Sequence, residues 1–350
     1  MKKTLVATLP VFLFVIFHTG AGAQSLNELY RLAREEGRLN LYGGGPAALY
    51  TADAKLFEER FPGIKVVIRG DFSNRLTGLI DSQIKAGKME ADIAVLQTIQ
   101  DFVRWKKEGV LVPLKSEAFA KIHPDFKDND GMYTGIAVSG IIYAYSPKLV
   151  DKRDVPKSAT DFLKPVLLGK IISTYPHDDD ITLYLYHGIV EKYGWGFMDG
   201  LMKNRPAFVM GHLGVVQKIA AGEHAVTFDA TTTQAMAEKN RGGSLEVVIP
   251  DDPFPIWAQT AATFRGASHP NAAKLYLAWY LSDEQQNRMV KRGGRWSPRS
   301  DLGAPAGFRA IMEYQIAKKF REFITADARV QELRKRFEDY IGPAKGGAYR

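Results

Sequence analysis

The sequence predicts an α/β protein built from two lobes. Short runs rich in branched aliphatic residues alternate with runs of ten or more residues that have helical spacing, and this alternation is typical of parallel sheets wrapped by helices. The chain has 350 residues, more than a single hydrophobic core comfortably supports. It contains no Pro-rich or Ser/Gly-rich linker, no repeat and no low-complexity tract. We therefore expect lobes joined by several crossings of the chain.

Two prolines and two polar residues mark the ends of the expected helices. The first helix has Pro46 near its first turn and Pro62-Gly63 at its end, and the second has Ser73 or Asn74 as its N-cap. In chain order, the expected elements are strand 38–44, helix 46–63, strand 64–70, helix 73–87, strand 91–97, helix 99–109, strand 170–175, helix 180–194, strand 207–211, helix 213–223, strand 225–230, helix 232–242, strands 245–252 and 256–266, and one long helix 269–293.

Residues 1–23 have the layout of a secretory signal peptide. Lys2 and Lys3 precede an apolar stretch, 5–17, that is too short for a permanent membrane span, and small residues follow at 21–23. The mature chain then begins at Gln24 and keeps 327 of the 350 residues, and loss of the two lysines lowers the formal net charge from +8 to +6. No other stretch has the length of a membrane span, so we expect no stable membrane insertion.

Composition also indicates the compartment and the partners. The chain has no cysteine, which excludes disulfides and a lipid anchor on an N-terminal cysteine. An exported protein without an anchor is retained only behind a second membrane, so we expect it in the periplasm, as a monomer. Basic residues are scattered among acidic ones rather than gathered in a stripe, so nucleic acid is not an expected partner.

Candidate ligand-binding residues follow from the sheet architecture. In α/β sheets, the loops that touch ligands leave the carboxyl ends of strands, and several of these loops open into a helix N-terminus that favours an anion. The candidates at such positions are Gly43, Gly44, Gly45, Phe72, Ser73, Gln97, Thr98, Ser173, Tyr175, His177, Asp229, Thr231 and Thr232, with Arg69 and Arg75 beside the second of these loops.

Several of these residues have a structural interpretation as well. The glycines at 43–45 either leave room for a solute or form a tight strand-to-helix turn. Arg75 either faces an anionic solute or is neutralised by Asp71. The threonines at 231–233 cap a helix or donate hydroxyls, and Asp229 binds a cationic group or caps its neighbour.

Motifs for catalysis, nucleotides and resident metals do not appear. The glycine run has Ala48 where a dinucleotide fingerprint needs glycine, and Met89 follows Gly87-Lys88 where a phosphate loop needs Ser or Thr. There is no nucleophile elbow, no H-E-x-x-H helix and no histidine pair at i, i+4. We interpret the acidic cluster 178–180 as helix-capping residues rather than metal ligands. We therefore expect no enzyme activity, no cofactor and no metal site; a secreted enzyme on the same fold is the alternative from another class.

Five segments together resemble the periplasmic solute-binding proteins of ABC importers, in the branch that includes binders of ferric iron, thiamine, phosphonates, sugar phosphates and polyamines. They are FEERFPGIKVVIRG, ADIAVLQ, GIAVSGIIYAYSPKLV, AGEHAVTF and SHPNAAKLYLAWYLSDEQQ. The resemblance covers nearly the whole mature chain. It implies a type II-like fold of two lobes with a ligand cleft between them, closure on binding, and an inner-membrane ABC permease as partner.

The resemblance also implies how the chain divides. Lobe 1 would comprise 24–137 and 258–310, and lobe 2 would comprise 138–257 and 311–350. The crossings would lie in GIAVSGIIYAYS and DDPFPIWAQTAATF, which adds Ser139 and Trp257 to the candidate ligand-binding residues. Trp257 and Tyr175 either stack on a flat solute or serve packing near the hinge.

One departure from the family pattern bears on the solute. The iron binders in this branch carry two adjacent tyrosines after a G-E-x-A-V segment. Here that segment, 222–226, is followed by TFDATTTQAM, which has no tyrosine. We therefore expect a small organic anion, such as a carboxylate or phosphonate, held by Arg69, Arg75 and the amides of 43–45. Ferric iron or an iron complex is the alternative solute.

Overall fold

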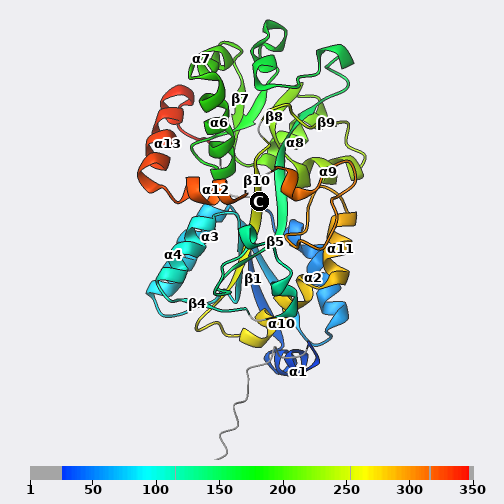
Figure 1. Cartoon of the computed structure of the whole chain (residues 1–350), viewed down its shortest axis with the longest axis vertical. Helices are drawn as coiled ribbons and strands as arrows, with labels where there is room; N and C mark the ends of the chain where they lie inside the picture. The colour runs from blue at the N-terminus through cyan, green and yellow to red at the C-terminus, as the bar shows by residue number, and fades with distance from the viewer. Residues whose placement is uncertain (1–25, 115, 253, 315–316, 347–350) are drawn as a thin grey trace, which may run out of the picture.

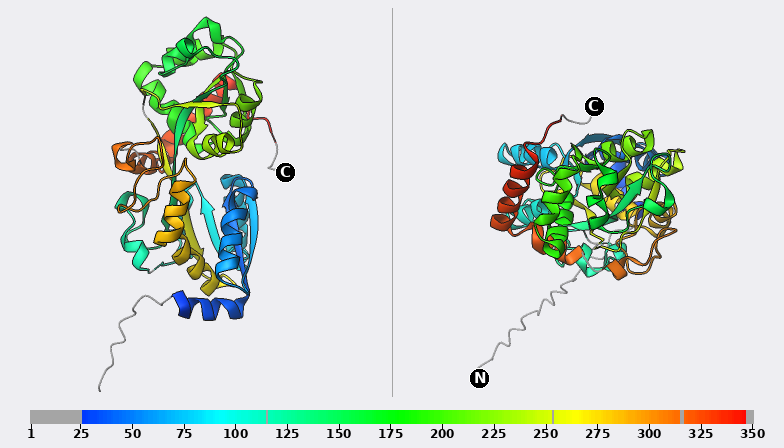
Figure 2. Two further views of the ribbon diagram at one scale, coloured as in Figure 1. Left: turned by 90° about the vertical axis from the view of Figure 1, so that its right-hand side faces the viewer. Right: turned by 90° about the horizontal axis from the view of Figure 1, so that it is seen from above.

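The computed structural model describes residues 26–114, 116–252, 254–314 and 317–346 (Figure 1). The expected signal peptide at 1–23 lies outside these residues. The elements form two lobes stacked along the long axis, with α1 (Leu26–Glu36) at one end and α7 (Gly196–Lys203) at the other (Figures 1 and 2). Within the described ranges, no helix is both long and apolar enough to cross a membrane.

One mixed sheet runs through both lobes. Its order is β2-β1-β3-β10-β5-β8, with β4 paired to β10 and β9 paired to β5, and a separate parallel pair joins β6 and β7. The strands are β1 (Arg38–Gly44), β2 (Lys65–Asp71), β3 (Ile93–Leu96), β4 (Leu111–Val112), β5 (Thr134–Tyr145), β6 (Ile172–Thr174), β7 (Ala207–Val209), β8 (Val226–Thr231), β9 (Glu246–Val248) and β10 (Ile256–Phe264).

The α/β class is confirmed, but the expectation of parallel sheets holds for only part of the main sheet. Strands β1, β2 and β3 are parallel, whereas β10 and β5 run antiparallel to their neighbours. The reason is that β5 and β10 carry the chain between the lobes. The first part of β5 pairs with β10, and its last residues, 141–145, pair with β8 and β9 in the other lobe. Both strands run through the centre of Figure 1. The residue boundaries of the two lobes remain a prediction.

Helices cover the sheet on both sides. The remaining α-helices are α2 (Ala48–Arg60), α3 (Ser73–Lys85), α4 (Ile99–Lys107), α5 (Glu117–Ala120), α6 (Asp180–Tyr193), α8 (His212–Ala221), α9 (Thr232–Asn240), α10 (Pro270–Tyr280), α11 (Asp283–Lys291), α12 (Ala317–Ile324) and α13 (Asp327–Ile341). The short 3-10 segments are Pro124–Phe126, Lys152–Asp154, Ala159–Leu163, Pro165–Leu167 and Ile311–Tyr314.

Two expectations about helix ends are wrong. The long helix 269–293 is two helices, because Ser282 accepts a hydrogen bond from the Gln285 backbone N–H and begins α11 as its N-cap. In addition, neither Ser73 nor Asn74 is the N-cap of α3. That position is Phe72, and the Ser73 hydroxyl instead accepts a hydrogen bond from the Gln97 N–H of the neighbouring strand loop.

Contacts between distant parts of the chain hold the first lobe together. Glu36, at the end of α1, accepts hydrogen bonds from the backbone N–H groups of Asn271 and Ala272 at the start of α10. The buried Asp53 carboxylate of α2 contacts Arg292 at 2.7 Å, beyond the end of α11. Figure 2 shows α1 and α2 in blue on the same lobe as α10 and α11 in yellow and orange.

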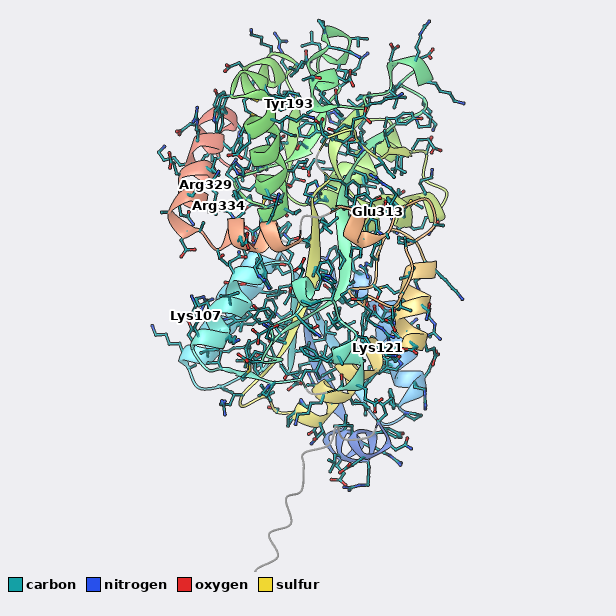
Figure 3. The ribbon with its side chains drawn as sticks, in the orientation of Figure 1. Lys107, Lys121, Tyr193, Glu313, Arg329 and Arg334 are labelled. Carbon is teal, nitrogen blue, oxygen red and sulfur yellow. The ribbon has the colours of Figure 1, made fainter. Side chains whose placement is uncertain are left out.

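The C-terminal helices pack against the second lobe and its junction with the first. Helix α13 packs on α6 and α7, with the Phe337 ring 5.5 Å from the Tyr186 ring. Arg334 of α13 donates hydrogen bonds to the His177 carbonyl and to Asp180, at the beginning of α6 (Figure 3). Helix α12 contacts both α4 and α6, which belong to different lobes.

Candidate functional site

A polar cleft lies where strand ends and helix beginnings of the two lobes meet. Its cavity measures about 70 Å³. The lining residues are Gly44, Gly45, Leu49, Phe72, Ser73, Gln97, Ser139, Asp179, Gly211, His212, Thr231, Thr233, Gln234, Trp257, Gln259 and Arg295. The cleft therefore combines loops after β1, β2 and β3 with the first residues of α6, α8 and α9.

About half of the candidate residues from the sequence line this cleft. They are Gly44, Gly45, Phe72, Ser73, Gln97, Ser139, Thr231 and Trp257. The candidates that do not line it are Gly43, Arg69, Arg75, Thr98, Ser173, Tyr175, His177, Asp229 and Thr232. The lining residues that the sequence did not single out as ligand-binding include Asp179, His212, Gln234, Gln259 and Arg295.

The three glycines at the end of β1, 43–45, contribute to packing and to the cleft. A Cβ on Gly43 would lie 2.4 Å from the Tyr50 ring, and one on Gly44 would lie 2.3 Å from the Ser73 hydroxyl. Gly45 has φ of +99°, a conformation that side-chain-bearing residues rarely adopt. Gly43 is thus required by the packing of α2 on β1, whereas Gly44 and Gly45 also form part of the cleft wall.

Both arginines named from the sequence lie outside the cleft. The Arg69 guanidinium lies over the Tyr42 ring, 5.7 Å from its centroid, beside a separate surface hollow. The Arg75 guanidinium lies over the Phe72 ring at 5.3 Å and pairs with Asp71 at 3.9 Å. The structure therefore favours the interpretation in which Asp71 neutralises Arg75.

Other candidates have structural contacts nearby. The Thr98 hydroxyl lies 3.5 Å from the Thr77 hydroxyl, and the Tyr175 ring stacks on Phe208 at 5.6 Å. The His177 ring packs edge-on against Tyr175, and burial lowers the pKa of His177. Thr232 donates to the Gly294 carbonyl and accepts from the Gly140 N–H, so its hydroxyl joins three segments rather than facing the cleft.

A buried polar network lies directly behind one wall of the cleft. The Asp229 carboxylate is fully buried and accepts hydrogen bonds from Ser173, the Thr174 N–H and Thr182. The His212 Nε2 lies 3.0 Å from an Asp229 oxygen. Ser173 and Asp229 are therefore supporting residues, and His212 is the member of the network that reaches the cleft.

His212 carries a positive charge to the cleft wall. Burial alone would lower the pKa of His212, but the carboxylates of Asp229 and Asp179 outweigh burial and raise this pKa to about 9. The Asp179 oxygen lies 3.9 Å from His212 Nδ1. The imidazolium is thus already neutralised by carboxylates on the lobe that holds it.

Asp179 is the N-cap of α6, the role that we expected for the acidic cluster. One of its oxygens accepts from the backbone N–H groups of Ile181 and Thr182 at the start of α6. The other accepts from the Gln97 side chain at 3.0 Å. Since Gln97 follows β3 and Asp179 begins α6, this hydrogen bond joins the two lobes across the cleft.

Arg295 is the cleft residue with an uncompensated charge. Gly294 has φ of +74°, and a Cβ there would lie 2.5 Å from the Thr232 carbonyl oxygen, so only glycine lets this segment approach α9. That approach places Arg295 in the cleft, where its Nε donates to the Thr233 hydroxyl at 3.4 Å. Across the described part of the chain, Arg295 forms no ion pair with a carboxylate.

Helix beginnings add to the positive potential of the cleft. The N-caps of α3, α8 and α9 are Phe72, Gly211 and Thr231, and all three line the cavity. Thr231 accepts a hydrogen bond from the Gln234 N–H, which confirms the capping interpretation of this threonine. Free N–H groups and helix dipoles at such positions favour negative charge.

Metal-ligating side chains do not cluster in the described part of the chain. Among the described residues, no three His, Cys, Asp or Glu side chains gather closely enough to hold a metal. The lining residues of the cleft also include no tyrosine.

A larger hollow of about 950 Å³ lies elsewhere, between α6 and residues 249–252 and 309–314. None of the residues singled out from the sequence lines it. Its most buried acid, Asp252, is already bound by Lys192 and Tyr193, each at 2.6 Å, and by Tyr143. We place the candidate site in the smaller cleft, because strand ends and helix beginnings of both lobes converge there.

Comparison with known proteins identifies the relatives of this chain. The family model described as "Bacterial extracellular solute-binding protein" matches residues 43–287. An uncharacterized protein of Haemophilus influenzae is 24% identical over 275 residues, which cover 75% of this chain and 78% of that protein.

Solved structures share the fold. Iron-bound HitA from Pseudomonas aeruginosa has 21% identity and a TM-score of 0.69, over 86% of this chain and 99% of that one. AfuA from Actinobacillus pleuropneumoniae, solved with fructose-6-phosphate bound, has 20% identity and a TM-score of 0.69, over 88% of this chain and 99% of that one. At these identities the likeness shows a common two-lobed architecture.

Proposed function

The chain belongs to the bacterial extracellular solute-binding proteins, and on that premise we propose that its cleft binds a small organic anion. The protein is the substrate-binding component of an ABC transporter, which captures a solute and delivers it to a membrane permease. The proposal concerns the chemical class of that solute. We propose that the solute carries a carboxylate, phosphonate or phosphate group, which supplies the negative charge that the cleft favours.

The observation that carries the proposal is the state of Arg295. A guanidinium in a narrow polar cleft, without a carboxylate partner among the described residues, calls for an anion from outside the chain. The N-termini of α3, α8 and α9 also favour an anion, because their helix dipoles stabilise negative charge in the same cavity. The other cleft cation, His212, does not require an anion from outside the chain, since Asp229 and Asp179 already neutralise its charge.

The two structural relatives illustrate both solute classes under consideration. HitA was solved with iron, and AfuA was solved with fructose-6-phosphate. The side chains of this cleft support the anion, since the one carboxylate in its lining, Asp179, is engaged by Gln97 and by the start of α6. Ferric ion prefers several anionic oxygen ligands, which this lining does not bring together.

We extend the proposal to catalysis, cellular location and oligomeric state. The family consists of binding proteins, and we propose that this chain, too, binds without turnover. We place it in the periplasm after removal of residues 1–23, and we expect a monomer.

The test is a solute screen followed by calorimetry. Carboxylates, phosphonates, sugar phosphates, polyamines and ferric citrate are compared by thermal shift, and the dissociation constant of the best solute is then measured. Solute at about 100 times this constant should stabilise the fold by about 2.7 kcal/mol. Arg295→Ala should weaken binding of the anion by roughly tenfold to a hundredfold, because a charge-assisted hydrogen bond contributes about 1.5–3 kcal/mol.

Arg75→Ala is the matched control, since Arg75 lies near the cleft but outside its lining. It should leave the dissociation constant within about twofold of the unmodified protein. The melting temperatures of both variants without solute establish that they fold. Stabilisation by polyamines alone, or reversible colour with ferric ion in Arg295→Ala as in the unmodified protein, would contradict an anion site.

A further inference from the structure

Two glutamine side chains in the cleft are left without hydrogen-bond partners. The amide oxygens Oε1 of Gln234 and Gln259 are buried, and neither accepts a hydrogen bond from any described residue. Both residues line the cavity, Gln234 from the first turn of α9 and Gln259 from β10. A buried polar atom without a partner costs stability, so such atoms in a binding site indicate what the ligand supplies.

The other polar side chains of the lining are already engaged. Ser139 and Thr233 share a hydrogen bond of 2.6 Å, Ser73 accepts from the Gln97 N–H, and Thr231 caps α9. The groups that remain for a solute are the guanidinium of Arg295 and the two glutamine amides. Trp257, which also lines the cleft, has a buried indole N–H without an acceptor among the described residues.

The anionic group alone does not satisfy the glutamines. A carboxylate, or a phosphate without its protons, only accepts hydrogen bonds, whereas an amide oxygen requires a donor. The solute must therefore carry a second polar group that donates. A hydroxyl donates and accepts, so it pairs with the amide oxygen and with the amide nitrogen of the same glutamine.

An ammonium group fits the cleft less well than a hydroxyl. A buried ammonium requires a carboxylate partner. Asp179 is the one carboxylate in the lining, and its two oxygens already bind the α6 N–H groups and Gln97. A hydroxyl is uncharged, so the neutral amides of Gln234 and Gln259 can bind it without a carboxylate.

From these contacts we infer that the solute is an anion whose carbon skeleton bears hydroxyl groups. Arg295 pairs with the anionic group, and Gln234 and Gln259 form hydrogen bonds with the hydroxyls. This inference rests on the proposed function, since it takes the cleft as the solute site. It narrows the class to compounds of the sugar phosphate or hydroxy acid kind.

The experiment uses pairs of anions that match in charge and length. Calorimetry on the full mature protein compares glycerol 3-phosphate with propyl phosphate, ribose 5-phosphate with pentyl phosphate, and glycerate with propanoate. Phosphoethanolamine tests the ammonium group. We expect the hydroxylated member of at least one pair to bind about tenfold or more tightly than its partner.

Variants then assign the preference to the glutamines. Gln234→Leu and Gln259→Leu should each reduce severalfold the ratio of the affinity for the hydroxylated anion to the affinity for the plain anion. Without solute, each variant should melt at the same or a higher temperature, because an unpaired buried amide has been removed. Gln217→Leu, at an exposed position of α8, is the control and should leave the ratio unchanged.

The outcomes separate this inference from the proposed function. If the plain anion binds as tightly as its hydroxylated partner in all three pairs, the hydroxyl inference is wrong and the anion site stands. If phosphoethanolamine binds most tightly, the second group is an ammonium and the inference is likewise wrong. If no anion of any kind binds, both the inference and the proposed function fail.

Discussion

His212 keeps its proton in an environment that would ordinarily remove it. The side chain is buried, yet Asp229 lies 3.0 Å from one ring nitrogen and Asp179 lies 3.9 Å from the other. The two carboxylates make the imidazolium the stable form, and the imidazolium in turn allows two acids to be buried beside the cleft. The charge of this wall therefore depends on all three residues together.

We expect the stability of the protein to fall in mild alkali because of His212. The folded-state pKa of about 9 lies above the unfolded value of about 6.5, so the stabilisation is fully present below pH 6.5 and is lost as pH rises through 9. Its full size is of the order of 3 kcal/mol. Urea unfolding at several pH values should show this loss in the unmodified protein and not in His212→Gln.

His224→Gln is the control for the pH series. Burial lowers the pKa of His224, so this histidine is neutral between pH 7 and 9 and should not contribute to the slope there. Equal slopes between pH 7 and 9 for the unmodified protein and His212→Gln would show that His212 does not hold its proton in the folded state.

The sequence predicted cleft residues that lie in loops at the carboxyl ends of strands. It missed cleft residues that lie elsewhere in the chain. Gly45, Ser73 and Gln97 follow β1, β2 and β3 and were found in this way. Arg295 follows a helix, and it reaches the cleft only because Gly293 and Gly294 both have positive φ. That glycine pair was the available signal, but the partner it approaches, Thr232, lies 62 residues away from Gly294 and cannot be read from local pattern.

At the scale of elements, local pattern predicted helices better than it predicted their ends. The run 269–293 has continuous helical spacing, and the break between α10 and α11 depends on the Ser282 cap. Strand direction was also not predicted, because the antiparallel strand β5 and the parallel strand β1 are both apolar runs in the sequence. The resemblance of GIAVSGIIYAYS and DDPFPIWAQTAATF to crossing segments located β5 and β10, whereas periodicity gave no direction for either.

Helix α10 begins on a carboxylate that belongs to another element. Glu36 of α1 accepts from the Asn271 and Ala272 N–H groups at 3.0 and 2.8 Å, and it also accepts from the Asn271 side chain. Glu36→Ala should therefore lower the free energy of unfolding by about 1.5–3 kcal/mol, since several charge-assisted hydrogen bonds are lost. Chemical denaturation of the solute-free protein measures the change.

The neighbouring Glu35 provides a matched comparison on the same helix. It is exposed, and among the described residues it pairs only with Arg31, four residues earlier. Glu35→Ala should change the free energy of unfolding by about 0.5 kcal/mol or less. Equal effects of the two substitutions would show that Glu36 does not serve as the cap of α10.

At the scale of the whole molecule, a small set of hydrogen bonds holds the lobes in contact. Gln97 donates to Asp179 at 3.0 Å, and Gln100 of α4 donates to Asp180 of α6 at 2.7 Å. Arg334 of α13 binds the same Asp180 from the other side. The carboxylates at the start of α6 are thus shared between capping, the C-terminal helix and the opposite lobe.

Gln100→Ala should shift the protein toward an open form. Gln100 lies outside the cleft lining, so its removal loosens lobe contact without touching the solute site. A hydrogen bond to a carboxylate contributes about 1.5–3 kcal/mol, which corresponds to roughly a tenfold or larger change in the ratio of closed to open molecules. Small-angle scattering should show a larger radius of gyration without solute, and the same radius as the unmodified protein at saturation.

The affinity of Gln100→Ala for solute should weaken by up to the same factor, because fewer molecules are closed before binding. Gln217→Ala, on the exposed face of α8, should change neither the radius nor the affinity. A radius for Gln100→Ala that matches the unmodified protein without solute would show that this hydrogen bond does not hold the lobes together.

The pairing of α2 with residues beyond α11 has a consequence for the order of events during synthesis. Asp53 is buried and meets Arg292, and Glu36 meets Asn271, so the first lobe lacks essential partners until more than four-fifths of the chain has left the ribosome. A nascent chain with such distant contacts folds late and slowly. The first lobe therefore stays unfolded for most of translation, which is the condition in which that part of the chain can still be threaded through a narrow membrane channel.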